Sequence, residues 1–166
     1  MAMQKFRVPV LLSMLMSLPA APAMSTPPGV GGPMVTRSVY VFPGQQGAEL
    51  LKQCSRQVPQ DISDYWTPTD DQVAALKTAL GGYLRKHSAD RGQVPSYPLD
   101  TYHGQYTGIV SGGKRLVYGN FYIHQADWLH EDTQPVNVCD GGSSFFGVVF
   151  DPAADRIVDV AFNGEG

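Results

Sequence analysis

The sequence predicts an α+β domain in which one main helix packs on an antiparallel meander of about four strands, closed by one disulfide. Apolar residues recur at helical spacing after Thr69, and after Tyr102 they recur at the two-residue spacing of strands. The chain also holds two cysteines. Its 166 residues suit one domain, and a composition of 43% hydrophobic and 16% charged residues is too apolar for a disordered chain.

The main helix is expected to begin at Thr69, because residues 69–72 (Thr-Asp-Asp-Gln) fit a capping box and place two acidic residues at the positive end of the helix dipole. One apolar stripe follows, formed by Val73, Leu76, Leu80, Tyr83 and Leu84. Gly81 and Gly82 weaken such a helix by about 1 kcal/mol each relative to Ala, and close approach to the sheet is the predicted reason. A shorter helix is predicted over residues 48–56.

Two strand pairs are predicted after the helix. Residues 102–109 and 115–124 alternate in polarity around a glycine turn, and residues 144–150 and 157–162 flank a turn that contains a proline. Residues 39–42 have the composition of one further short strand. One helix followed by four antiparallel strands is a cystatin-like layout, with the helix packed across one face of the sheet.

The predicted sheet is rich in aromatic side chains, and its second face has two interpretations. Because strand faces alternate, one residue of the pair Phe121 and Tyr122 must point away from the helix. Either residues 39–66, drawn over by the disulfide, cover that face, or it is an exposed aromatic binding patch. The residues predicted to bind a ligand are Tyr106, Tyr118, Tyr122, Trp128 and Asp140. Phe121 and Phe146 are expected to lie in the core.

Residues 1–23 have the layout of a secretory signal peptide: two basic residues, a short apolar stretch and a small-residue cleavage motif that ends at Ala23. Residues 24–37, rich in Pro and Gly, are expected to form a flexible tether, and residues 38–166 the single domain. Without the signal peptide the net charge of −3 becomes −5, because two of the 12 basic residues are removed. The protein is therefore expected in the periplasm or outside the cell.

Cys54 and Cys139 are predicted to form a disulfide. They are 85 positions apart, and in an oxidising exported compartment an isolated pair of cysteines is typical of a structural crosslink. A metal-binding pair or a nucleophilic cysteine is less well supported, because neither residue lies in a ligand-spaced motif.

Three residues form the strongest candidate for metal or acid–base chemistry. His124, Asp127 and His130 are spaced three positions apart, which places suitable metal ligands near one helical face. The segment is short and lacks the HExxH order of a zinc peptidase. A polar surface turn anchored by Trp128 is the simpler interpretation, so no catalytic residue, metal or cofactor is assigned.

The string Cys139-Asp140-Gly141-Gly142 also has two interpretations. Two glycines allow a tight turn whose amide N–H groups can bind an anion. Glycines are equally what a turn needs beside a disulfide, and this structural interpretation is the simpler one.

Several short strings together carry a family resemblance. They are Trp66-x-Pro68, Gly104-Gln105-Tyr106-x-Gly108-Ile109-Val110, Gly112-Gly113-Lys114-Arg115, Cys139-Asp140-Gly141-Gly142, Phe146-Gly147-Val148 and Phe162-Asn163-Gly164. From about Cys54 to the C-terminus, the chain resembles small exported bacterial proteins of uncharacterised function. The resemblance implies export and a single domain, and it supplies no activity.

The expected function is that of an exported binding or inhibitory module, a monomer without catalysis, which acts on a protein or a cell-envelope component. The acidic charge argues against nucleic acid as a partner. No apolar run reaches the roughly 20 residues of a membrane span. The alternative is a small periplasmic hydrolase or metal-dependent enzyme that uses His124, Asp127 and His130.

Overall fold

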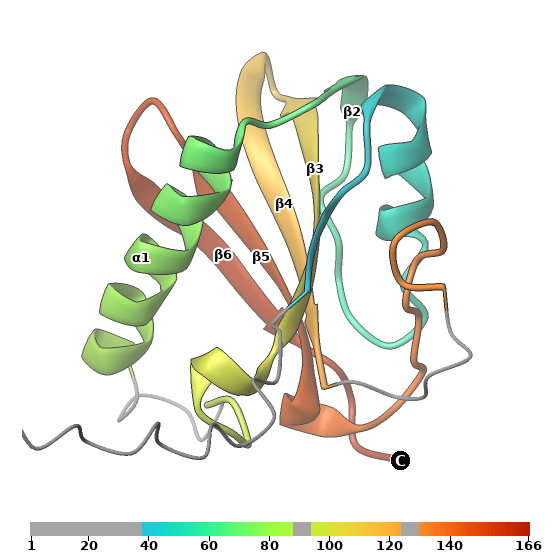
Figure 1. Ribbon diagram of the computed structural model, residues 1–166, viewed down its shortest axis with the longest axis vertical. Coiled ribbons are helices and arrows are strands. Elements are labelled where there is room, and N and C mark those ends of the chain that lie inside the picture. Colours follow the sequence, from blue (N-terminus) through green and yellow to red (C-terminus); the bar gives the residue numbers. More distant parts are fainter. Residues whose placement is uncertain (1–37, 88–93, 124–129) are drawn as a thin grey trace, which may run out of the picture. The chain divides into compact units, whose positions relative to one another are not determined.

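One α-helix and six strands make up the part of the chain that the computed structural model describes, residues 38–87, 94–123 and 130–166 (Figure 1). The strands are β1 (Val39–Val41), β2 (Ile62–Trp66), β3 (His103–Ser111), β4 (Lys114–Tyr122), β5 (Phe145–Asp151) and β6 (Arg156–Phe162). The α-helix is α1 (Asp70–His87), and three 3-10 helices are η1 (Gly44–Leu51), η2 (Leu99–Thr101) and η3 (Gly142–Ser144). The fold is therefore α+β with one main helix, as predicted.

The sheet contains the predicted meander and two strands more. β3, β4, β5 and β6 pair in sequence order, each antiparallel to the next. β1 and β2 share the remaining edge of β3, where β1 runs parallel to residues 104–106 and β2 antiparallel to residues 108–111. β1 lies where one further short strand was predicted, over residues 39–42, so the strand count exceeds the prediction by β2 alone. β2 was not predicted because polar residues interrupt its apolar pattern and its register shifts between Ile62 and Asp64.

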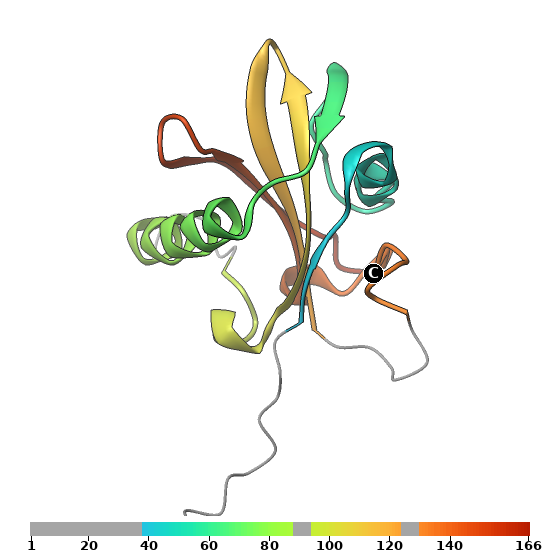
Figure 2. The ribbon, with the colours of Figure 1, turned by 45° about the horizontal axis from the view of Figure 1, so that its top comes forward.

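Helices cover both faces of the sheet: Figure 2 shows α1 on one side and η1 on the other. On the α1 face, Leu76 and Leu80 are fully buried against strand residues that include Phe121 and Phe146. The rings of these two phenylalanines stack with their centroids 4.9 Å apart, which confirms both as core residues. On the η1 face, a second cluster gathers around Leu50. Burying both faces accounts for the many aromatic residues on the strands.

The capping box at the start of α1 is confirmed. The backbone N–H of Thr69 donates to Gln72 Oε1 at 2.9 Å, and the backbone N–H of Gln72 donates to Thr69 Oγ1 at 3.3 Å. Of the predicted stripe, Val73, Leu76 and Leu80 are buried, and Tyr83 and Leu84 pack partly buried against the same core.

The reason predicted for Gly81 and Gly82 is wrong. A Cβ on Gly81 would have Arg85 Nη1, 3.5 Å away, as its neighbour, and a Cβ on Gly82 would meet only Arg85 Nη2 at 4.0 Å. Neither glycine touches the sheet. The close approach occurs instead at Gly47 of η1, where a Cβ would fall 1.8 Å from Thr107 Oγ1.

The short N-terminal helix also differs from its prediction over residues 48–56. η1 begins at Gly44 and ends at Leu51, and it is a 3-10 helix. Its early start follows Pro43, whose carbonyl accepts from the Gln46 N–H at 3.2 Å. Leu50 alone of its apolar residues is fully buried, so the tighter helix presents one anchor to the sheet rather than a stripe.

The Cys54–Cys139 disulfide is confirmed, with the two Cα atoms 5.0 Å apart. It joins the segment after η1 to the segment before β5 and closes a loop that contains β2, α1, β3 and β4. Within the described residues, no helix has the length and apolar character needed to cross a bilayer.

Candidate functional site

The three tyrosines predicted to bind a ligand are buried, so the prediction of an exposed aromatic patch is wrong. Tyr106, Tyr118 and Tyr122 are 1%, 1% and 0% exposed. Tyr106 lies on the α1 face, edge-on to Phe121 with ring centroids 5.7 Å apart. Tyr118 lies on the opposite face, in the cluster of η1, which confirms the alternative in which residues 39–66 cover that face. The hydroxyl groups had suggested that these tyrosines meet solvent, but side chains of the same domain surround them.

Of the other two predicted ligand-binding residues, Trp128 lies outside the described residues, and Asp140 is exposed. The turn that follows Asp140 uses its glycines for backbone geometry, since Gly141 and Gly142 have φ angles of 92° and 52°. The Gly142 N–H donates to the Gly164 carbonyl at 3.1 Å, and the Ser144 N–H to the Gly141 carbonyl at 3.1 Å. These amides bind within the chain, which supports the structural interpretation of the turn.

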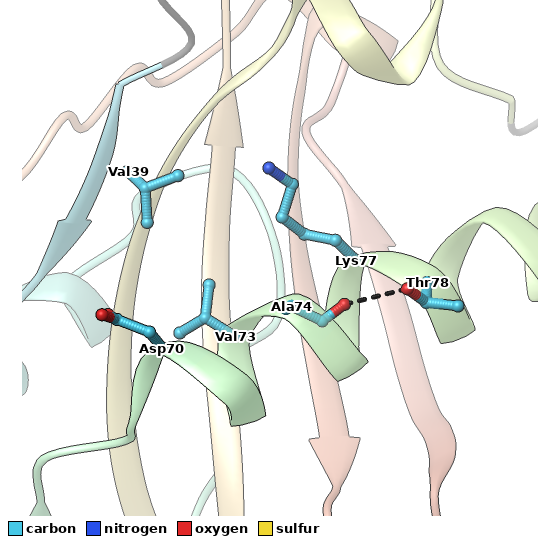
Figure 3. Close-up of a pocket in the computed structure, with 6 residues that line it drawn as sticks. All are labelled: Val39, Asp70, Val73, Ala74, Lys77 and Thr78. Atoms are coloured by element: carbon cyan, nitrogen blue, oxygen red, sulfur yellow. Dashed lines mark hydrogen bonds between the residues drawn. The ribbon is translucent and has the colours of Figure 1, made fainter.

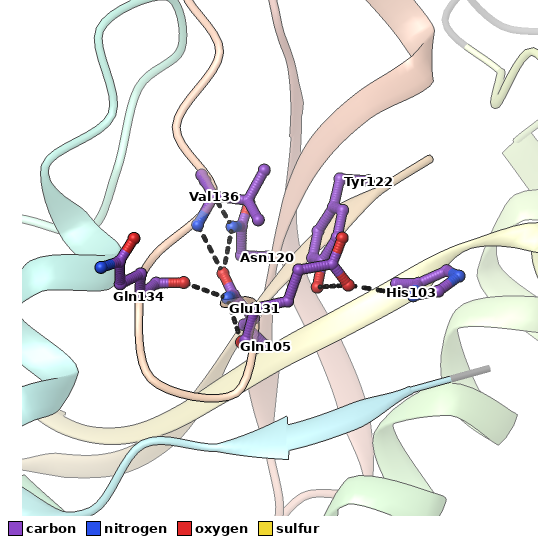
Figure 4. A network of polar contacts seen from close by, with 7 residues as sticks. All are labelled: His103, Gln105, Asn120, Tyr122, Glu131, Gln134 and Val136. Atoms are coloured by element: carbon purple, nitrogen blue, oxygen red, sulfur yellow. Dashed lines mark hydrogen bonds and ion pairs between the residues drawn. The ribbon is translucent and has the colours of Figure 1, made fainter. Parts of the chain in front are cut away.

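A network of buried polar side chains joins β3 and β4 to the loop that holds residues 131–136 (Figure 4). Gln105 uses the full hydrogen-bonding capacity of its amide. Its Oε1 accepts from Asn120 Nδ2 at 3.1 Å and from the Val136 N–H at 2.8 Å. Its Nε2 donates to the carbonyl oxygens of Glu131 and Gln134, both at 2.7 Å. Gln105, on β3, thus binds the loop formed by residues 131–136 and holds it on the sheet.

Arg56 extends this network from the segment after η1. It donates to Asn120 Oδ1, to the Tyr118 hydroxyl at 3.1 Å and to Asn163 Oδ1 at 2.7 Å. Asn163 Nδ2 in turn donates to the Asp140 carbonyl at 3.1 Å. The guanidinium therefore connects β4 to Asn163, the residue that follows β6. Arg56 itself lies two positions after the disulfide-bonded Cys54.

The third part of the network is an acid, an imidazole and a phenol. Glu131 Oε2 accepts from the Tyr122 hydroxyl at 3.1 Å and lies 3.2 Å from His103 Nδ1. His103 and Glu131 are 6% and 4% exposed. Burial, reinforced by the Glu131 carboxylate, raises the pKa of Tyr122 well above its ordinary range. Since these groups are shielded from solvent and the Tyr122 hydroxyl donates to the Glu131 carboxylate, we interpret the cluster as an anchor for the loop rather than as a reactive centre.

An open groove follows one flank of α1, and we call it the flank groove. Its helical wall consists of Asp70, Val73, Ala74, Lys77, Thr78, Leu80, Gly81, Leu84 and Arg85, which recur at helical spacing and so lie on one side of the helix. The groove consists of three hollows of about 530, 130 and 470 Å³. Successive hollows share a wall residue, Lys77 for the first pair and Leu99 for the second, so they adjoin.

Exposed apolar side chains gather along this groove. Four large apolar side chains are exposed in the part of the chain that the structure describes, and three of them line the flank groove: Val39 at 43%, Val94 at 38% and Tyr97 at 49%. The fourth, Val158 at 45%, lies on β6 and is not among the residues that line the groove. Val39 lines the first hollow, and Val94 and Tyr97 line the third, so an apolar side chain is exposed toward each end of the groove.

The first hollow combines this apolar surface with opposite charges (Figure 3). Val39 of β1 and Val73 of α1 face each other across it, and Lys77 stands beside them. Asp70 lies at the start of the helix, seven positions before Lys77. Neither charged side chain makes an ion pair or a hydrogen bond with another described residue, and both are exposed. The hollow thus offers one anionic and one cationic contact above an apolar floor.

The predicted metal candidate cannot be assembled from the described residues. His124 and Asp127 lie outside them, and His130 is exposed. Among the residues in ranges 38–87, 94–123 and 130–166, no cluster of three His, Cys, Asp or Glu side chains has the arrangement of a metal site.

Sequence reasoning missed the flank groove. Its far wall comes from β1, from residues 94–100 and from Phe121 of β4. Residues 94–100 carry no helical or strand pattern that would have indicated a wall there. The signal that was present is the Gly81-Gly82 pair, a local weakness in the helix that no internal contact requires.

Comparison of the chain with protein-family models, with curated proteins and with solved structures found no match.

Proposed function

We propose that this protein is an exported, disulfide-stapled binding or inhibitory module, which recognises a protein or a cell-envelope ligand through the flank groove. The observation that carries the proposal is the gathering of Val39, Val94 and Tyr97 along one groove beside α1. Tyr97 supplies a large apolar body with a hydroxyl that tolerates water, which is the kind of side chain that anchors interfaces.

The buried network supports a binding role over catalysis. In the described residues, the side chains with acid–base chemistry that lie together, His103, Tyr122 and Glu131, are buried and hold a loop. A reacting group must be reached by its substrate. The flank groove is open, and it pairs apolar surface with isolated charges, as ligand-binding surfaces do.

Export is supported by the signal-like layout of residues 1–23, by the resemblance to small exported bacterial proteins and by the disulfide. N-terminal sequencing of protein recovered outside the cytoplasm should place the first residue near Met24. Recovery of the folded protein with Met1 intact would contradict the export proposal and leave the binding proposal to be judged separately.

Affinity capture tests the binding role. The exported protein, immobilised with its disulfide intact, should retain a partner from an envelope extract of the cells that export it. The purified partner should then bind wild type and lose about tenfold in affinity for Tyr97→Ala, since truncating an aromatic anchor costs more than about 1 kcal/mol of binding energy.

Val158→Ala is the matched control, because Val158 is as exposed as the groove residues but lies on β6. Val158→Ala should melt at the wild-type temperature, and Tyr97→Ala should melt only slightly lower, because the Tyr97 ring meets the Tyr102 ring edge-on with centroids 6.4 Å apart. Equal losses in both variants, or none in either, would count against the flank groove as the binding surface. A stoichiometric bound metal with turnover of a substrate would instead favour the enzyme alternative.

A further inference from the structure

The structure points to the form and chemistry of the ligand, an inference that rests on the proposed binding function. We infer that the flank groove binds an extended polypeptide segment, which places an acidic side chain at Lys77 and a large apolar side chain over Gly81, two positions away along the ligand.

The dimensions of the groove favour an extended chain. From Asp70 to Arg85 the helix wall is about 22 Å long, at 1.5 Å of rise per residue. An extended segment covers that length with about seven residues. The middle hollow, at about 130 Å³, is the smallest of the three. A volume of that size has no room for a helix, which with its side chains is about 10–12 Å wide, so the ligand that passes through it must be extended. A small molecule would fill one hollow and leave the other two empty.

Charge along the groove determines what the segment must carry. Asp70 is negative, Lys77 is positive, and neither has a partner among the described residues. The other charged residues that line the groove, Asp100 in the middle hollow and Arg85 in the third, are already engaged in interactions of their own. A complementary segment therefore carries a basic group near the start of α1 and an acidic group at Lys77. A uniformly acidic or uniformly basic segment would meet a like charge at one of these two positions.

Gly81 is the third residue that determines which ligand fits the groove. It lines the third hollow together with Leu84 and Tyr97, and the absence of a side chain there leaves room between them. A glycine inside a helix costs stability relative to Ala, and no contact within the described residues requires one at this position. Space for a ligand side chain explains the residue.

The spacing of Lys77 and Gly81 matches that of an extended ligand. Four residues of helix rise by about 6 Å, and two residues of strand rise by about 6.6 Å. Side chains two positions apart in an extended chain point to the same face. An acidic residue and a large apolar residue at that spacing therefore reach Lys77 and the space above Gly81 together.

A displayed library of random nine-residue peptides, selected against the exported protein with its disulfide intact, tests the inference. Peptides retained by wild type should share an acidic residue two positions from a large apolar residue. Lys77→Glu should select a basic residue at the acidic position instead. A synthetic peptide of the selected sequence should bind Gly81→Ala about tenfold more weakly, as expected when a methyl group occupies space a ligand side chain needs.

Gly82→Ala is the matched control. Gly82 does not line the groove, and both alanines improve helix propensity, so both variants should melt no lower than wild type while only Gly81→Ala loses affinity. The inference is overturned if Lys77→Glu and wild type select the same peptides and the two alanine variants bind the synthetic peptide equally well. In that case the protein binds peptides, but not through Lys77 and Gly81. If the wild-type protein still binds its captured partner but selects no peptide, the extended peptide is ruled out as the ligand. The binding function would then stand.

Discussion

Gln105 and Asn120 face each other across β3 and β4, and the side-chain amide of Asn120 donates to Gln105 Oε1 at 3.1 Å. Both side chains also bond to the backbone of Val136, the N–H through Gln105 and the carbonyl through Asn120. A loop with little regular structure is thus held on the sheet by side chains in place of a neighbouring strand. In this chain the Gly104-Gln105-Tyr106 string therefore contributes to the fold, through the hydrogen bonds of Gln105 and the buried ring of Tyr106.

Gln105→Ala should lower the free energy of unfolding by about 3 kcal/mol or more. The substitution removes the partner of the Val136 N–H and of two carbonyl groups, and each buried polar group left unsatisfied costs about 1–3 kcal/mol. Urea denaturation measures the change. Gln57→Ala, at an exposed position, should change stability by no more than about 0.5 kcal/mol. Equal values for the two variants would contradict a structural role for the network.

Replacing both Cys54 and Cys139 with serine should lower the free energy of unfolding by about 4–5 kcal/mol. The disulfide closes a loop of 85 positions, and the chain-entropy model gives this magnitude for a loop of that size. Denaturation of the oxidised wild type and of the double variant measures the effect. A reducing agent should bring wild type to the stability of the double variant and leave that variant unchanged. A double variant as stable as oxidised wild type would show that the crosslink is incidental.

The main helix and the meander could be predicted because each depends on local pattern. The capping box at Thr69 and the alternation after Tyr102 both appear in the structure at the positions that the sequence indicates. β2 could not be predicted in this way, because pairing with β3 stabilises a strand whose own sequence is half polar.

Exposure was the harder property to predict. Tyr118 carries a polar hydroxyl, and its burial depends on Arg56, 62 positions earlier, which donates to that hydroxyl. Tyr97 is exposed although it lies only five positions before the buried Tyr102. Which tyrosine meets solvent is decided by long-range contacts between segments, and single-sequence patterns do not report those contacts. Tyr106, Tyr118 and Tyr122 were wrongly predicted to be exposed for the same reason.

Stability should fall steeply above about pH 10. Burial raises the pKa of the Tyr106, Tyr118 and Tyr122 hydroxyls above the ordinary value of 10.0. Above that pH the unfolded chain loses phenolic protons that the folded chain keeps, so unfolding releases protons and alkali favours it. Each such tyrosine contributes a slope of about 1.4 kcal/mol per pH unit. Urea denaturation from about pH 8 to about pH 11 would reveal the trend.

Tyr106→Phe is the control for that trend. It should match the stability of wild type near neutral pH to within about 0.5 kcal/mol, since only a hydroxyl is removed and no described hydrogen bond depends on it. Above about pH 10 its stability should fall with a shallower slope, by the contribution of one tyrosine. A stability that stays constant through this range would contradict burial of the three hydroxyls.

Gly108→Ala and Gly82→Ala should change stability in opposite directions. A Cβ on Gly108 would fall 2.3 Å from the Trp66 ring. That ring cannot shift easily, because its Nε1 donates to the Ile109 carbonyl at 3.0 Å and the Arg115 guanidinium lies 4.1 Å from its centroid. Gly108→Ala should therefore lower the free energy of unfolding by about 1–3 kcal/mol.

Gly82→Ala should raise the free energy of unfolding by about 0.5–1 kcal/mol, since the helix gains propensity and the nearest atom to the added Cβ is 4.0 Å away. Urea denaturation compares the two, and a loss of tryptophan near-UV circular dichroism should accompany only Gly108→Ala. A Gly108→Ala variant as stable as wild type would show that Trp66 does not need the bare backbone of β3.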